Sequence, residues 1–178
     1  MVDYKEITKH LRSLMINSFN DYRIRVIQLQ SNATRPKDIY GTIDILNTTD
    51  SAGYTTNKWF DYDTSEIVYE TYKDVLISIS VRNGDYTNIE NQDKIAYLAD
   101  RFHKSLTYEN VLKYLDEKLN ATVKSTQQIR QLPDYTPTGI GEVSMFNMVL
   151  RVVDQTRVYS TDLVEHISVN DITIPTPT

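Results

Sequence analysis

Clustered carboxylates are the first place to look for chemistry, because Asp and Glu oxygens bind divalent cations and transfer protons. The densest acidic group comprises Asp50, Asp61, Asp63 and Glu66. It lacks the spaced oxygen ligands and central glycine of an EF-hand loop. A nuclease site needs clustered carboxylates and usually a lysine on an adjacent strand. Asp44 and Asp74 could approach each other across a hairpin, but no further residue completes such a site. We therefore interpret the acidic group as a solvated loop and predict no metal site.

Other residue types that carry catalysis are no better placed. His10, His103 and His166 are isolated, and packing or solvent exposure is a commoner role for such histidines than metal ligation. The 5 glycines form no phosphate-binding loop, and no Ser or Thr stands in a nucleophile-elbow pattern. The chain has no cysteine, which excludes disulfides and thiolate chemistry. We predict a protein that is not an enzyme and needs no cofactor.

Aromatic residues are more informative than the titratable ones. The chain has 13 tyrosines beside 4 phenylalanines and 1 tryptophan, which suits half-wet interfaces and suits β-strands equally well. The stretch "TTDSAGYTTNKWFDYD" (48–63) gathers large side chains where a loop is normally polar. An exposed cluster of this kind indicates a partner. The predicted contact residues here are Tyr54, Lys58, Trp59, Phe60 and Tyr62. In the alternative, Trp59 folds back as a lid on the core.

An unusually long strand positions this tip. Residues 64–85 read as one extended strand of about 19 residues that runs into a turn, whereas most strands have 3 to 10. In its second half Val75, Ile77, Ile79 and Val81 share one apolar face, which predicts burial. The first half has no clean core face. We expect it to pair with strand 39–47 in a hairpin arm, about residues 43–73, with Tyr69 and Tyr72 as further contact residues.

The remaining pattern predicts an α+β domain. Helical spacing indicates an N-terminal helix at 4–16, capped by Asp3, and a central pair of helices between Asn91 and Leu119. Further expected elements are a strand at 22–30, a strand or extended connector at 121–132, a loop at 133–142, a strand at 143–153 and a terminal strand at 163–174. We expect one domain over residues 1–174, a mainly antiparallel twisted sheet with a long protruding β-hairpin, and a short Pro/Thr tail at 175–178.

The strand at 143–153 carries apolar residues on both faces. Phe146, Met148, Leu150 and Val152 share the face that we expect to join the core. The opposite face is mixed, and helices or another subunit are the expected cover. Its candidate interface residues are Met145, Asn147, Val149 and Arg151.

The net charge and hydropathy of the chain argue against two classes of partner, nucleic acids and membranes. The formal net charge is −5 and the sequence pI is about 5.2, which argues against nucleic-acid binding through phosphate neutralisation. The first residues are charged and no run approaches the roughly 20 apolar residues of a membrane span. We expect a soluble protein made in a cytosol, with no membrane partner.

The order and spacing of several segments resemble the tail or neck terminator proteins of long-tailed bacteriophages. The resemblance runs from the first helix to about Ile174, and it rests on "RPKDIYGTIDI", "NQDKIAYLADRFHKSL", "YENVLKYLDEKLNATV", "QQIRQLPDYTPTGIGEVSMFNMVLRV" and "VEHISV". The chain departs from the family pattern in the length of segment 48–63 and in its short tail.

The resemblance implies a structural virion protein of the tail or neck, assembled in the host cytoplasm and without catalytic residues. Such a protein forms a ring, typically a homohexamer, on the last ring of the tail tube. It ends tube polymerisation and offers a docking surface to the head–tail connector or stopper protein, with the tail sheath as a further candidate partner. DNA passes through the lumen without specific binding, and an acidic lumen would repel phosphate.

Other functions stay open. A head-completion or tail-completion factor of the connector region would have a similar small α+β fold. From different classes, the alternatives are an adaptor domain whose aromatic tip binds a peptide, and an accessory enzyme or nucleic-acid-binding factor, which would need a polar pocket or a basic face.

Overall fold

The computed structural model describes residues 2–19, 24–27, 35–50, 57–84, 90–136 and 139–159. The helices in these ranges are α1 (Tyr4–Phe19), α2 (Glu90–Ser105) and α3 (Glu109–Leu119). The strands are β1 (Arg25–Ile27), β2 (Ile39–Asp50), β3 (Asn57–Asp61), β4 (Glu66–Asn83), β5 (Ala121–Thr126), β6 (Arg130–Thr136) and β7 (Gly139–Tyr159). The predicted α+β class is confirmed.

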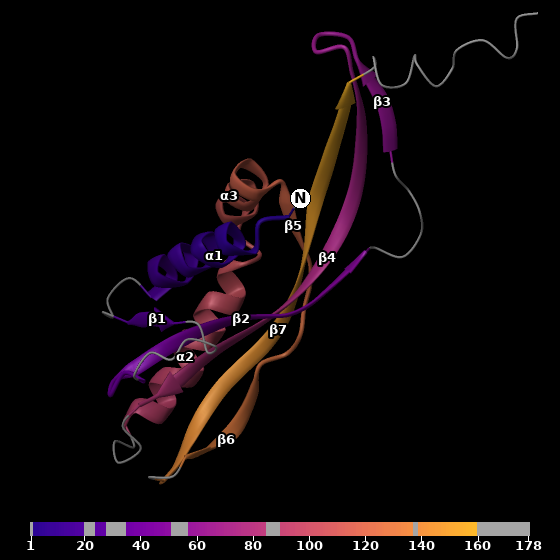
Figure 1. Cartoon of the computed structure of the whole chain (residues 1–178). Coiled ribbons are helices and arrows are strands. Elements are labelled where there is room, and N and C mark those ends of the chain that lie inside the picture. The colour runs from indigo at the N-terminus through magenta and orange to yellow at the C-terminus, as the bar shows by residue number, and fades with distance from the viewer. Residues whose placement is uncertain are drawn as a thin grey trace, which may run out of the picture.

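All of these strands belong to one twisted sheet with β4 at its centre (Figure 1). The strand order is β1-β2-β4-β7-β5, with β3 beside β4 and β6 beside β7. Only β1 and β2 pair in parallel, so the sheet is mostly antiparallel, as predicted.

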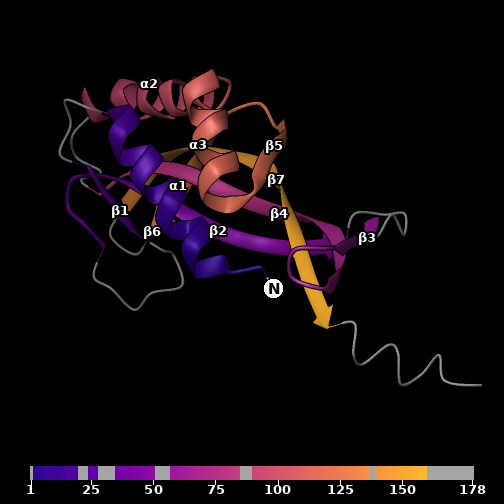
Figure 2. The ribbon, with the colours of Figure 1, turned by 90° about the horizontal axis from the view of Figure 1, so that it is seen from above.

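The three helices lie on the same side of the sheet (Figure 2), and the core fills the space between. Val75, Ile77, Ile79 and Val81 of β4 are each at most 1% exposed, so the period-2 prediction of a buried face is confirmed. Antiparallel register sets Leu150, Met148 and Phe146 of β7 beside the first three of them. The helices contribute the matching apolar stripes, among them Ile7, Leu11, Met15, Phe19, Ile95, Leu98, Phe102 and Leu115.

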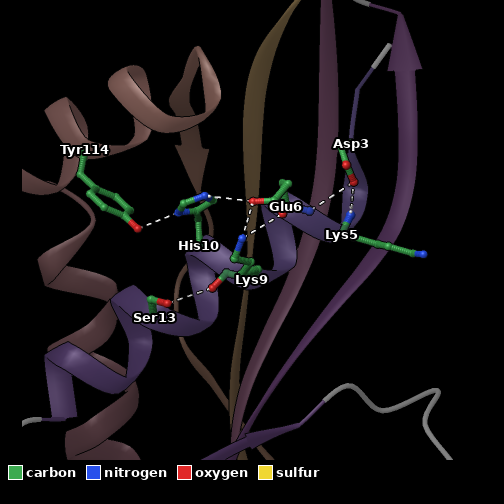
Figure 3. Close-up of polar contacts among 7 residues, drawn as sticks. All are labelled: Asp3, Lys5, Glu6, Lys9, His10, Ser13 and Tyr114. Atoms are coloured by element: carbon green, nitrogen blue, oxygen red, sulfur yellow. Dashed lines mark hydrogen bonds and ion pairs between the residues drawn. The ribbon is translucent and has the colours of Figure 1, made fainter.

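The N-terminal cap of α1 is the predicted one. The Asp3 carboxylate accepts hydrogen bonds from the backbone N–H groups of Lys5 at 2.9 Å and Glu6 at 3.2 Å (Figure 3). These bonds satisfy donors that a helix start leaves unpaired. The helix runs to Phe19, three residues beyond the predicted end, because Phe19 is fully buried and packs edge-on against Phe102.

The loop predicted at 133–142 is wrong. β6 and β7 pair across this segment, from Arg130↔Met145 to Thr136↔Gly139. Pro133 signalled a loop, but β6 is an edge strand, where a missing N–H can face away from the ladder. β7 also continues to Tyr159, beyond the predicted end at 153, because β4 pairs with it along that whole length. The predicted terminal strand and the Pro/Thr tail lie outside the described residues.

The long strand is confirmed, whereas a protruding hairpin is not. β2 and β4 pair antiparallel as predicted, from Ile39↔Asn83 to Asp50↔Lys73. However, β7 pairs with the other edge of β4, so the part of β4 beyond the helices is the middle of three strands, β3, β4 and β7 (Figure 1). We call the three strand segments in this region the distal end of the sheet. They are Asn57–Asp61, Glu66–Asp74 and Arg151–Tyr159.

Gly84, the residue after β4, lies against the backbone just before β2. Gly84 does not have a positive φ; it is required by close approach. A Cβ at Gly84 would lie 1.9 Å from the Pro36 carbonyl oxygen and 2.9 Å from that of Asp38. The Gly84 N–H also donates to the Asp38 carbonyl at 3.2 Å, which fixes the start of β2 against the end of β4.

Gly84→Ala should therefore destabilise the protein by about 2–3 kcal/mol or more, because backbone atoms must move. Gly41→Ala is the matched control: its Cβ would meet the flexible end of Met15, so we expect a loss of about 1 kcal/mol. Urea unfolding of both variants checks the order, and equal losses would contradict the close-approach argument.

Candidate interaction surface

We call the face of the sheet away from the helices the outer face. The residues of the predicted second interface lie on it. In register, Met145, Asn147, Val149 and Arg151 of β7 lie opposite Ser80, Ser78, Leu76 and Asp74 of β4. All four side chains of β7 are half-buried. Asn47, Thr49, Leu76 and Val149 line a hollow of about 290 Å³ on this face, together with Asp74, Lys124 and Ser125. The sequence therefore placed these four residues on a common surface correctly; their role as an interface stays a prediction.

An ion-pair group around the buried Asp74 carboxylate lies at the edge of this hollow. The Arg151 guanidinium donates from Nε at 2.9 Å and from Nη2 at 3.2 Å to the two Asp74 oxygens. Lys124 Nζ donates to Asp74 Oδ2 at 2.6 Å. The hydrogen bonds from Arg151, then those from Lys124, hold the pKa of Asp74 below its usual range. Arg151 also lies 5.9 Å from the ring centre of Tyr72, so this predicted contact residue joins the same group.

Two further polar groups lie on the outer face of the distal end, and the first of them surrounds Glu70. Glu70 accepts hydrogen bonds from Gln155, Tyr72 and Asn57, at 3.1, 2.8 and 3.3 Å. These bonds, that of Gln155 first, lower the pKa of Glu70. Each group joins neighbouring strands through side chains, where the helices no longer supply a core.

The third group involves two of the acidic residues considered as a calcium loop, Asp61 and Glu66. Arg157 Nη1 lies 3.1 Å from Glu66 Oε2 and 3.2 Å from Asp61 Oδ2, so these carboxylates hold a cation of the chain itself. Within the described ranges, no three His or acidic side chains form a group that could hold a metal ion. Asp44 and Asp74 are apart: β2 pairs Asp44 with Ser78, and Thr49 with Asp74.

The aromatic tip forms a strand, β3, and most of its side chains remain exposed. Trp59 is 41% exposed, Phe60 38% and Tyr62 86%. Phe60 and Tyr62 meet edge to face at 5.0 Å, and Lys58 Nζ lies 5.3 Å from the Tyr69 ring centre. The predicted arm residues that the structure describes lie in or beside the distal end, with Tyr72 nearer the middle of the sheet, and their role as contacts stays a prediction. Tyr54 lies outside the described residues.

The alternative role of Trp59, a lid on the core, finds no support. Trp59 is the register partner of Val68, and Arg157 flanks Val68 on the other side. Val68 is fully buried but is not part of the main core cluster. Trp59 therefore lies over the distal end.

The histidines that the structure describes have packing roles. His103 lies 3.1 Å from the Gln127 carbonyl oxygen and edge-on to Phe146. His10 joins two helices: Nδ1 is 2.6 Å from the Tyr114 hydroxyl and Nε2 is 3.3 Å from Glu6 (Figure 3). Sequence reasoning missed this contact, although Glu6 and His10 stand one helical turn apart. His166 lies outside the described residues.

Asp74→Asn should cost about 1 kcal/mol of unfolding free energy at neutral pH, because Arg151 and Lys124 lose their acceptor charge. Since the pKa of Asp74 is lowered in the folded protein, its contribution is present above the unfolded value of about 3.9 and disappears as pH falls through the folded value. The variant should therefore lose less stability than the parent on acidification below that pH, as measured by urea unfolding.

Asp100→Asn, in an exposed helical pair with Lys104, is the control and should change little. If Asp74→Asn and Asp100→Asn behaved alike, the Asp74 ion-pair group would not be a significant cross-strand contact.

Comparison with known proteins shows the family of this chain. No curated protein matches the chain. No helix in the part of the chain that the structure describes is long and apolar enough to cross a membrane. The family model of the phage neck terminator proteins matches residues 4–178, which include all the helices and strands described above. The chain therefore belongs to the phage neck terminator family, whose members are structural proteins of the virion neck.

Proposed function

We propose that this neck terminator protein forms a closed ring, a homohexamer, at the head-proximal end of the tail. The ring ends polymerisation of the tail tube and joins the tail to the head–tail connector or stopper protein. DNA passes through its lumen without specific binding, and a tail sheath is a further candidate neighbour. The family supplies the neck role; the observation that supports assembly through this chain's own surfaces is the exposed aromatic strand at the distal end.

β3 has the features of a surface that a partner covers. Among the described strands it pairs only with β4, so the ladder groups on its other edge are available. Free strand edges promote pairing with other chains, and proteins usually blunt them. Here the edge carries Trp59 and Phe60, each more than a third exposed. Aromatic side chains of this kind dominate the binding energy of protein interfaces.

Ring closure requires two different patches on each subunit, because a head-to-tail contact joins unlike surfaces. The distal end is the first patch. The outer-face residues Met145, Asn147, Val149 and Arg151 form the second, since they are half-buried and lie on a face that no described helix covers (Figure 2). This division gives the predicted interface residues that the structure describes a place in the two contacts, with Arg151 where the two patches meet.

The acidic charge fits a DNA passage. At a formal charge of −5 per chain, a ring presents an excess of carboxylates to the duplex. Like charges reduce adhesion of the phosphate backbone, so the genome moves without binding. A head-completion or tail-completion factor remains the alternative within the neck region, and the symmetry of the ring and the end of the tail that it binds separate the two.

The direct test is negative-stain electron microscopy of the purified protein, with its mass measured over a range of concentrations and after addition of isolated tails. Closed rings with a DNA-sized hole, alone or on the tail end, support the proposal. A protein that stays monomeric at every concentration and does not bind tails would overturn it.

Substituting Trp59, Phe60 and Tyr62 together by Ala should leave the helix-covered core folded, since none of the three belongs to the core cluster, but should weaken assembly at least tenfold. The matched control replaces Tyr4 and Tyr97, which are 42% and 54% exposed on helices, by Ala. Sedimentation and thermal unfolding of both variants separate assembly from stability. Rings that form equally well in the triple variant would show that the distal end is not the contact.

A further inference from the structure

Residues of α1, α2 and α3 line a pocket of about 500 Å³. These helices lie on the side of the sheet opposite the outer face (Figure 2). The volume of the pocket is in the range of pockets that hold a small ligand or a few peptide side chains. Leu14 of α1 and Val111 of α3 supply apolar lining, while Arg101, Tyr108 and Tyr114 supply the larger polar groups. The surfaces assigned to assembly do not include any of these residues.

Arg101 is the unusual member of this lining. It is half-buried, yet within the described ranges it makes no hydrogen bond or ion pair. The carboxylate one residue earlier is occupied, because Asp100 binds Lys104 at 2.7 Å. By contrast, Arg151 and Arg157 each bind carboxylates of this chain. A guanidinium partly withdrawn from water favours a planar anion that accepts two hydrogen bonds.

Tyr114, another residue that lines the pocket, is held in place. The Tyr114 hydroxyl is 2.6 Å from His10 Nδ1, and His10 Nε2 is 3.3 Å from Glu6, which also binds Lys9 at 3.0 Å (Figure 3). This chain of contacts joins α3 to α1 across the pocket wall. A wall fixed before binding reduces the entropy that a ligand must lose.

The rim of the pocket indicates the kind of anion. Tyr108 lines it and is 55% exposed, and Leu14 of α1, which is half-buried, also lines the pocket. Apolar side chains beside a cation suit an occupant that offers apolar contact as well as charge. A free inorganic ion would use Arg101 alone and leave this surface in water.

We propose that this pocket docks a segment of a partner polypeptide that carries an acidic side chain beside an aliphatic one. The carboxylate pairs with Arg101, and the aliphatic side chain lies against Tyr108 and Leu14. The site is independent of ring formation, since it uses the helices, whereas assembly uses the strands.

The test uses two tripeptide amides, acetyl-Leu-Glu-Leu and its Gln counterpart, titrated into the isotope-labelled full chain and followed by NMR. We expect the Glu peptide to shift the Arg101 Nε–H signal and the Tyr114 ring signals in a saturable way, with a dissociation constant of about 1–10 mM. The Gln peptide should bind at least fivefold more weakly.

Two variants identify the contact. Arg101→Gln should abolish the shifts at Tyr114, whereas Arg12→Gln, an exposed arginine of α1 outside the pocket, should leave them unchanged. Arg101→Lys keeps the charge but loses the two-bond geometry, so it should weaken binding severalfold and serves if Arg101→Gln fails to fold.

Three results would overturn the proposal: no saturable shift at Arg101, equal affinity for both peptides, or inorganic phosphate binding there as tightly as the Glu peptide. The last would identify a small-anion site in place of a docking site. None of them depends on whether the protein forms rings, so failure here and failure of the proposed function are distinguishable.

Discussion

The antiparallel ladder between β4 and β7 is the constraint on which the rest of the structure depends. It runs without interruption from Glu66↔Tyr159 to Arg82↔Val143. Over Val75–Val81 the ladder lies under the helices, where each buried aliphatic side chain contributes about 1.5–3 kcal/mol. Over Glu66–Asp74 no side chain of β4 belongs to that core cluster. Polar side-chain groups join the strands there, and each contributes about 1 kcal/mol or less. The helix-covered half therefore anchors the distal end, which alone would be marginal.

Sequence patterns specified much of this arrangement. The period of 2 in β4 and the period of 3.6 in α1, α2 and α3 predicted the elements and the buried faces, because both patterns reflect a single apolar side. They could not predict that β7 covers the distal half of β4, since pairing partners depend on register between segments far apart in the chain. For the same reason the sequence could not predict the Asp74–Arg151–Lys124 group, although Asp74 and Arg151 were each considered for other roles. Pro133 and the two glycines after it outweighed the strand signal of β6, and the loop prediction failed there.

The two sides of the sheet have different chemistry, which suits a protein with several neighbours. The outer face and distal end present strand edges, aromatic rings and paired charges, all positioned by one rigid ladder. The helix side presents a pocket with a cation that no described residue neutralises. Contacts made by a rigid sheet fix geometry, whereas a pocket between helices selects a side chain. A neck protein that must align a ring and also recognise a neighbour needs both.

Hydrogen exchange of the free chain and of the same chain assembled on tails tests most directly whether the distal end is the assembly contact. Among the described strands, β3 pairs only with β4, so its outward amides should exchange quickly in the free chain, while the amides of Val75–Val81 are already protected by the ladder and the core. We predict that assembly slows exchange in Asn57–Asp61 by at least tenfold and leaves Val75–Val81 unchanged. Equal exchange of β3 in both states would contradict the account, because the exposed strand would then remain open to water in the virion.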